Sequence, residues 1–122
     1  RSTTNEGLVA LDPAGQVVPA LAERWIVTED GQSYIFRLRE SSWPDGEEIT
    51  AAEIRRLLRA AIAELGGTSM GLDLAKIRDI RAMTGRVIEI RLTSPQADFL
   101  RLLAQPELGF AKSGSGTGPM VA

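Results

Sequence analysis

Three acidic residues, Asp45, Glu47 and Glu48, are the first candidates for chemistry because they gather in one turn. Paired carboxylates serve as general acid and base when their surroundings push the two pKa values apart. Nothing in the neighbouring sequence supplies the apolar pocket that this separation needs, so a solvated turn ahead of a helix is the favoured interpretation. The chain has no cysteine and no histidine, which excludes thiolate nucleophiles, imidazole bases, Ser-His-Asp triads and Cys/His zinc sites.

A glycine-rich stretch, Gly114-Ser115-Gly116-Thr117-Gly118, has the composition of a loop that cradles phosphate through backbone amides. A Walker loop needs Gly-Lys-Ser/Thr at the start of a helix, but Pro119 follows this stretch directly. The dinucleotide-binding fingerprint also fails, in its spacing and in the missing strand before it. We therefore expect residues 112–122 to form a Gly/Ser-rich exit segment.

Two tryptophans and one arginine group are the remaining candidates for ligand contact. Trp25 opens an alternating strand and Trp43 lies in a turn before a helix, so core packing is favoured over ligand stacking for both. Arg55, Arg56 and Arg59 have the charge to bind an anion, but a solvated helix face explains them more simply. We predict no catalytic residue, no metal ligand and no cofactor, and we do not expect an enzyme.

The composition is that of one ordinary globular domain. The chain has 122 residues, of which 43% are apolar and 25% charged, and domains commonly contain about 100–200 residues. The formal net charge of −2 argues against a nucleic-acid partner, which usually requires a basic face. No apolar run approaches the ~20 residues that cross a bilayer, so the chain is not expected to span a membrane.

The elements that must position these residues begin with extended pieces around Gly7–Leu11 and Val17–Pro19, separated by a turn at residues 12–15. A hairpin follows, with arms at Trp25–Thr28 and Ser33–Arg39; its second arm alternates apolar and polar residues. Thr50 and Glu53 then form the pattern of a capping box, which predicts a helix from about Ala51 to Leu65, ended by glycines.

The second half repeats this layout. A short helical turn is predicted within residues 72–77, and a second hairpin has arms at Arg78–Met83 and Arg86–Thr93. A last helix opens at Ser94-Pro95 and carries Phe99 and the leucines after it. The predicted fold class is α+β: an antiparallel sheet built from two hairpins, with the two main helices packed on one face. Residues 1–111 are expected to form this single subdomain.

Several motifs, taken in order, resemble those of one family. They are Asn5-Glu6-Gly7-Leu8-Val9, Asp12-Pro13-Ala14-Gly15, Val18-Pro19-Ala20-Leu21-Ala22-Glu23-Arg24-Trp25, Trp43-Pro44-Asp45-Gly46, Ile49-Thr50-Ala51-Ala52-Glu53-Ile54 and Gly116-Thr117-Gly118-Pro119. Together they resemble the family 5 extracellular solute-binding proteins, the dipeptide-, oligopeptide- and nickel-binding components of ABC importers.

The resemblance implies a much longer protein in which two lobes close around a ligand, and this chain corresponds to a small subdomain of the first lobe, beside the cleft. It implies a bacterial protein of the periplasm or the cell exterior, which captures peptides or similar solutes and hands them to ABC transporter membrane subunits. Two departures prevent the transfer of ligand contacts: residues 66–73 form a short segment without an aromatic residue, and Met120 stands where the family commonly has Tyr or Trp. The ligand-binding residues therefore remain unassigned.

Two other functions stay open. The same fold is compatible with the ligand-sensing domain of a cytoplasmic transcriptional regulator, which a helix-turn-helix ahead of Arg1 would indicate. It is also compatible with a standalone interaction domain, which a gene product that ends near Ala122 would indicate.

Overall fold

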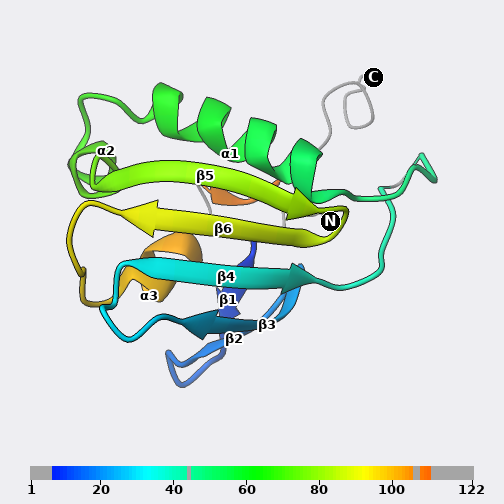
Figure 1. Ribbon diagram of the computed structural model, residues 1–122, viewed down its shortest axis with the longest axis horizontal. Helices are drawn as coiled ribbons and strands as arrows, with labels where there is room; N and C mark the ends of the chain where they lie inside the picture. Colours follow the sequence, from blue (N-terminus) through cyan, green and yellow to red (C-terminus); the bar gives the residue numbers. More distant parts are fainter. Residues whose placement is uncertain (1–6, 44, 106–107, 111–122) are drawn as a thin grey trace.

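The computed structural model describes residues 7–43, 45–105 and 108–110, and its strands form two antiparallel sheets (Figure 1). The smaller sheet is a ribbon of β1 (Val9–Leu11) and β2 (Val17–Pro19). The larger sheet contains, in spatial order, β3 (Ala22–Val27), β4 (Ser33–Leu38), β6 (Val87–Leu92) and β5 (Ile77–Thr84). The helices are α1 (Ala51–Glu64), α2 (Ser69–Leu74) and α3 (Phe99–Leu103). Within these described residues, no helix combines the length and apolar character needed to cross a membrane.

Both predicted hairpins are present, and they join through their second arms, β4 and β6. Tyr34 lies opposite Ile90, and Phe36 lies opposite Ile88. These side chains are buried on one face of the sheet, whereas Arg37, opposite Val87, lies on the other face and is partly exposed. The alternation of apolar and polar residues therefore predicts the buried face correctly.

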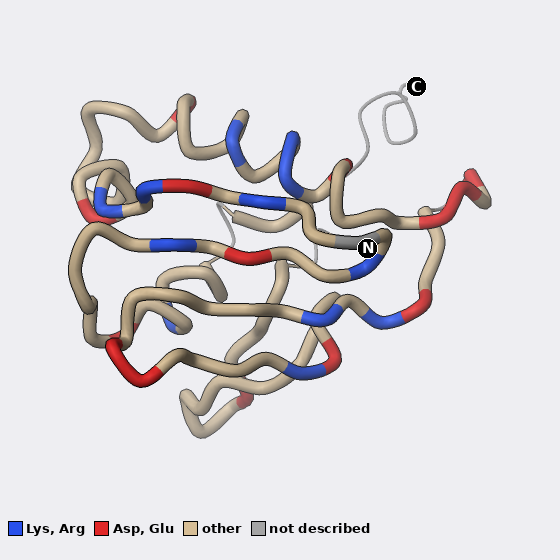
Figure 2. Tube along the Cα trace, in the orientation of Figure 1, with Lys and Arg blue, Asp and Glu red and all other residues tan. Residues whose placement is uncertain are grey.

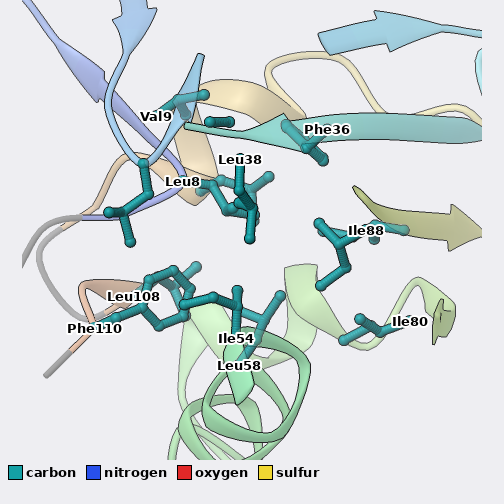
Figure 3. Close-up of a cluster of buried hydrophobic side chains, with 14 of the residues drawn as sticks. Leu8, Val9, Phe36, Leu38, Ile54, Leu58, Ile80, Ile88, Leu108 and Phe110 are labelled. Atoms are coloured by element: carbon teal, nitrogen blue, oxygen red, sulfur yellow. The ribbon is translucent and has the colours of Figure 1, made fainter. Parts of the chain in front are cut away.

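One hydrophobic core fills the buried face of the larger sheet (Figure 3). From α1, Ile54 and Leu58 are fully buried in this core. From α3, Phe99 places its ring 4.8 Å from the ring of Tyr34. Both main helices thus pack on one face of the antiparallel sheet, which confirms the predicted fold class. The core is completed by residues near both ends of the described chain: Leu8, Val9, Leu108 and Phe110.

The start of α1 follows from a cap and two flanking isoleucines. Thr50 is the N-cap, and its Oγ1 accepts a hydrogen bond of 3.3 Å from Glu53 N. Ile49 and Ile54 on either side of this cap are both buried, as a hydrophobic staple requires. The Glu53 side chain departs from the pattern of a capping box, because its Oε1 accepts a bond from Trp43 Nε1.

The shorter elements differ from their predicted boundaries. The first extended pieces pair as the β1–β2 ribbon, a third hairpin beside the two that were predicted. The short helical turn is α2, which begins earlier than predicted because Thr68 Oγ1 caps it by accepting a bond from Gly71 N. The last helix starts at Phe99 instead of at Ser94-Pro95, because Asp98 adopts a left-handed conformation (φ 64°) that a right-handed helix cannot contain.

Candidate functional site

The predicted acidic group lies in the loop that leads into α1, where Figure 2 shows a stretch of acidic positions. Asp45, Glu47 and Glu48 are all exposed. Asp45 Oδ1 accepts a bond of 3.0 Å from Glu47 N, and the backbone bonds from Trp43 N to Glu47 O and from Gly46 N to Trp43 O close the loop. The group is therefore the solvated turn that the sequence predicts. Among the residues that the structure describes, no group of three or more His, Cys, Asp or Glu side chains could hold a metal ion.

Trp43 holds this loop against the start of α1. Its side chain is 6% exposed, and its Nε1 donates a hydrogen bond of 2.5 Å to Glu53 Oε1. A buried indole whose N–H has a partner is typical of a packing residue. The prediction that Trp43 packs over the helix start is confirmed.

Trp25 also packs, but less completely. Its ring centroid lies 6.3 Å from that of Phe36, with the two planes tilted by 42°, and the side chain is partly exposed. It borders a shallow hollow of about 160 Å³ together with Ile26, Ile35 and Val87 and two arginines. The glycine-rich stretch, Gly114 to Gly118, lies outside the described residues.

The three arginines of α1 each have a partner in the fold. Arg55 Nε donates to the backbone oxygen of Ile80 at 2.6 Å. Arg56 lies 3.7 Å from Glu53, and Arg59 lies 3.6 Å from Asp79. Each guanidinium meets an acceptor within the chain, as expected for the partly solvated helix face that the sequence predicts.

The structure brings together a polar groove that the sequence does not predict. We call it the α2–α3 groove; it has a volume of about 490 Å³ and is lined by Met70, Asp73, Gln96, Ala97, Asp98, Arg101, Leu102 and Gln105. Its volume falls within the ~300–1,000 Å³ of typical ligand pockets. No sequence pattern relates α2 to α3. The two helices come close in space only because the hairpin of β5 and β6 between them folds back on itself.

Hydrogen bonds fix part of this groove and leave part of it open. Arg101 Nη1 donates to Gly15 O at 2.5 Å, and Gln105 Nε2 donates to Arg101 O at 3.0 Å. Gln96 Oε1 is buried and has no hydrogen-bond partner among the described residues. The carboxylates of Asp73 and Asp98, which are exposed, give the groove the ability to accept hydrogen bonds from an ammonium or amide group.

A third hollow lies between α1, α2 and β5 and is lined mainly by apolar residues. Its volume is about 260 Å³, and Ile62, Leu74 and Ile80 are among its lining residues. The Arg59–Asp79 ion pair borders it. The volume is below the ~300 Å³ of ordinary ligand pockets, so this hollow is a poorer candidate than the α2–α3 groove.

Within the part of the chain that the structure describes, the pKa values of Asp30 and Tyr34 are shifted, and neither side chain lines these hollows. The Thr28 hydroxyl, with the backbone N–H of Gln32, donates to the carboxylate of Asp30 and lowers its pKa. Burial raises the pKa of Tyr34. The shift of Asp30 follows from the local structure of the first hairpin, and the shift of Tyr34 follows from its burial in the core beside Phe99, so neither indicates acid–base chemistry.

Comparison with known proteins covers nearly the whole chain. The model of the bacterial extracellular solute-binding proteins, family 5 (middle), matches residues 16–120. The probable deoxycholate-binding periplasmic protein YgiS of Escherichia coli K12 is 32% identical over 121 residues, covering 84% of this chain and 23% of the relative. The dipeptide-binding protein DppE of Bacillus subtilis 168 is 32% identical over 117 residues, covering 83% of this chain and 22% of the relative.

A solved structure indicates the same family. The binding protein AgaA of A. tumefaciens R10, in complex with agropinic acid, has a TM-score of 0.79 at 28% identity, covering 86% of this chain and 21% of that chain. The chain thus spans 21–23% of the length of the proteins named here. The sequence match, the structural match and the motifs point to the same conclusion: the chain belongs to the bacterial extracellular solute-binding proteins of family 5.

Proposed function

We propose that this chain acts as one subdomain of a longer binding protein that captures peptides or similar small solutes for an ABC importer. The observation that carries the proposal is the family match over residues 16–120, in a chain that corresponds to 23% or less of the relatives named above. Residues 1–111 would form the subdomain, and residues 112–122 would lead out of it. The longer protein would act in the bacterial periplasm or outside the cell and would deliver its solute to transporter membrane subunits.

The shape of the described surface supports a shared site. Small solutes are bound with about 70–90% of their surface enclosed. Of the hollows described above, the α2–α3 groove is open, and the other two have volumes of about 260 and 160 Å³. A cleft closed by further parts of the protein would supply the missing enclosure. The chain alone is therefore expected to bind solutes weakly, and the absence of a nucleophile–base arrangement in the sequence favours binding over catalysis.

The relatives suggest the class of solute. Their names and complexes include a dipeptide and agropinic acid, and a further relative is a nickel-binding periplasmic protein. We favour organic solutes that carry a carboxylate group, alone or together with an ammonium group as in a dipeptide. The α2–α3 groove has groups of both signs, Asp73, Asp98 and Arg101, that would suit such a solute at its edge.

Native mass spectrometry tests this proposal. The 122-residue chain and the product of the intact gene are each offered the same panel of dipeptides, oligopeptides, opines and Ni²⁺. We expect saturable binding by the intact product and at most weak, unsaturated binding by the chain alone. Tight binding by the chain alone, or an intact product that ends with this chain, would contradict the proposal and would favour a standalone domain.

A further inference from the structure

The hydrogen-bond pattern of the larger sheet shows which backbone groups of β5 face outward. In an antiparallel sheet, successive residues of a strand direct their N–H and C=O groups to alternate sides. Leu92 N donates to Gln32 O at 2.7 Å, toward β4, so Ile90 also bonds to β4. Ile80 lies opposite Ile90. Its own backbone groups therefore point away from β6, to the outer edge of the sheet.

Side chains of the same chain satisfy both of these outward groups. Ile80 O accepts a bond of 2.6 Å from Arg55 Nε, and Ile80 N donates to Asp79 Oδ1 at 2.9 Å. The pairing of β5 with β6 is also irregular at two places. Capped groups and bulges are the devices by which proteins prevent a further strand from adding to an edge. At Ile80, the edge of β5 is therefore closed.

The same reasoning applied to β3 finds outward backbone groups that no described side chain caps, although the pairing of β3 with β4 is irregular between Ala22 and Arg24. Thr28 N donates to Ser33 O at 3.0 Å, so by alternation Ile26 bonds to β4. The backbone groups of Trp25 and Val27 then point away from the sheet. β3 is the last strand on this side, at the lower edge of the sheet in Figure 1, and no hydrogen bond to these outward groups occurs among the described residues.

The side chains of this stretch are unusually apolar for a free edge. Ile26 is 63% exposed and Val27 is 44% exposed. Among the described residues, a backbone bond covers the beginning of β3, where Ala22 N donates to Leu8 O at 2.9 Å. We use the term β3 edge for the stretch Trp25 to Val27. An exposed apolar edge can pair with a further strand, and proteins usually prevent this. The β3 edge lacks the capping bonds that Ile80 of β5 has.

We propose that the β3 edge pairs with an extended segment from the rest of the family-length protein, which continues the sheet beyond β3. This inference rests on the proposed function. The relatives are more than four times as long as the part that this chain matches, so most of the polypeptide that would surround the subdomain lies outside this chain. An edge that is always covered within one polypeptide requires no capping of its own, which accounts for the difference between β3 and β5.

Charge disfavours a second copy of the chain as the occupant. Antiparallel self-pairing that centres on Ile26 places Trp25 opposite Val27 of the second copy, which joins the apolar parts of the two edges. The same register brings Glu23 opposite Glu29 of the second copy at both ends of the pair. Like charges in opposing positions destabilise strand pairing. A heterologous segment avoids this repulsion.

Hydrogen exchange at single amides provides the test. In the isolated chain, the amides of Trp25 and Val27 should exchange quickly, whereas that of Ile26 should be protected by its bond to β4. In the product of the intact gene, we expect exchange at Trp25 and Val27 to slow by about tenfold or more, since each would gain a backbone hydrogen bond, while Ile26 stays protected. Val27→Pro, which removes an outward N–H and none of the bonds to β4, should abolish the added protection at Trp25; Val27→Ala is the matched control and should retain it.

Each result separates this inference from the proposed function. If the intact product binds a solute but exchanges quickly at Trp25 and Val27, the β3 edge is free and the inference is wrong, while the proposed function stands. Protection that appears in the isolated chain only at high concentration, together with a dimer mass, would make a second copy the occupant and would also overturn the inference. If the intact product binds no solute, the proposed function fails, and the exchange data still decide whether the edge is paired.

Discussion

Replacing Trp43 with Phe should destabilise the chain mainly through the loss of one hydrogen bond. The indole Nε1 lies 2.5 Å from Glu53 Oε1, and the side chain is 6% exposed. Phe retains much of the apolar burial but has no donor, so the carboxylate of Glu53 loses a partner. If Trp43 were instead a stacking residue for a solute, the substitution would lower solute binding and leave stability nearly unchanged.

The size of the effect follows from the surroundings of the carboxylate. A hydrogen bond to a charged group contributes about 1.5–3 kcal/mol to stability. The Glu53 side chain is 19% exposed, and water can replace part of the lost bond. We therefore expect a coupling of about 1–2 kcal/mol between Trp43 and Glu53. The ion pair of Glu53 with Arg56, whose side chain is 67% exposed, should contribute about 0.5 kcal/mol or less.

A double-mutant cycle isolates this coupling. Urea unfolding followed by far-UV circular dichroism gives the free energy of unfolding for the original chain, Trp43→Phe, Glu53→Gln and the double variant. Arg56→Ala is the matched control, because it removes a different partner of the same carboxylate. A coupling below about 0.3 kcal/mol, within the error of additive behaviour, would refute the role that we assign to this bond.

Three further predictions concern the core, the cap and the first hairpin. Ile54→Ala should lower the free energy of unfolding by about 2–5 kcal/mol, because Ile54 is fully buried; a loss below about 1 kcal/mol in urea unfolding would contradict its place in the core. Thr50→Ala should cost about 1 kcal/mol in the same assay, and Thr50→Ser should restore most of it; equal stabilities would contradict the cap. Tyr34 is the only tyrosine, so the absorbance of the phenolate reports its titration alone. Burial raises its pKa above the ordinary 10.0. The midpoint of this titration should fall when urea unfolds the chain. Between the unfolded and the folded pKa, the folded state keeps a proton that the unfolded state releases. The free energy of unfolding should therefore fall as the pH rises across this interval. Identical titration midpoints for the folded and the unfolded chain would contradict this prediction.

The sequence predicts the parts of the fold that depend on local pattern. The alternation in Ser33–Leu38 and Val87–Leu92 identifies the buried face of both arms, since burial on one face of a strand imposes a period of two. The Thr50 cap places the start of α1 because a helix N-terminus needs an acceptor for its free N–H groups. These signals lie within a few residues of the structure that they determine.

The features that the sequence does not predict depend on contacts between distant segments. The α2–α3 groove joins Met70 and Asp73 to Arg101, and the Arg101 side chain is held by a bond to Gly15. The left-handed conformation of Asp98, which shortens α3, has no local sign such as a glycine. The closed edge of β5 likewise depends on a bond from α1. The Trp43–Glu53 bond is intermediate: the capping-box pattern identifies the right residue, but the tertiary contact gives its carboxylate a different partner.

A crystal structure of the product of the intact gene, grown with a solute that it captures, tests the central claim most directly. We expect residues 7–110 to form the same subdomain within a longer two-lobed protein, with the solute enclosed mostly by residues outside this chain. A solute enclosed by residues of this chain alone, or a mature product that consists of this chain only, would contradict the account.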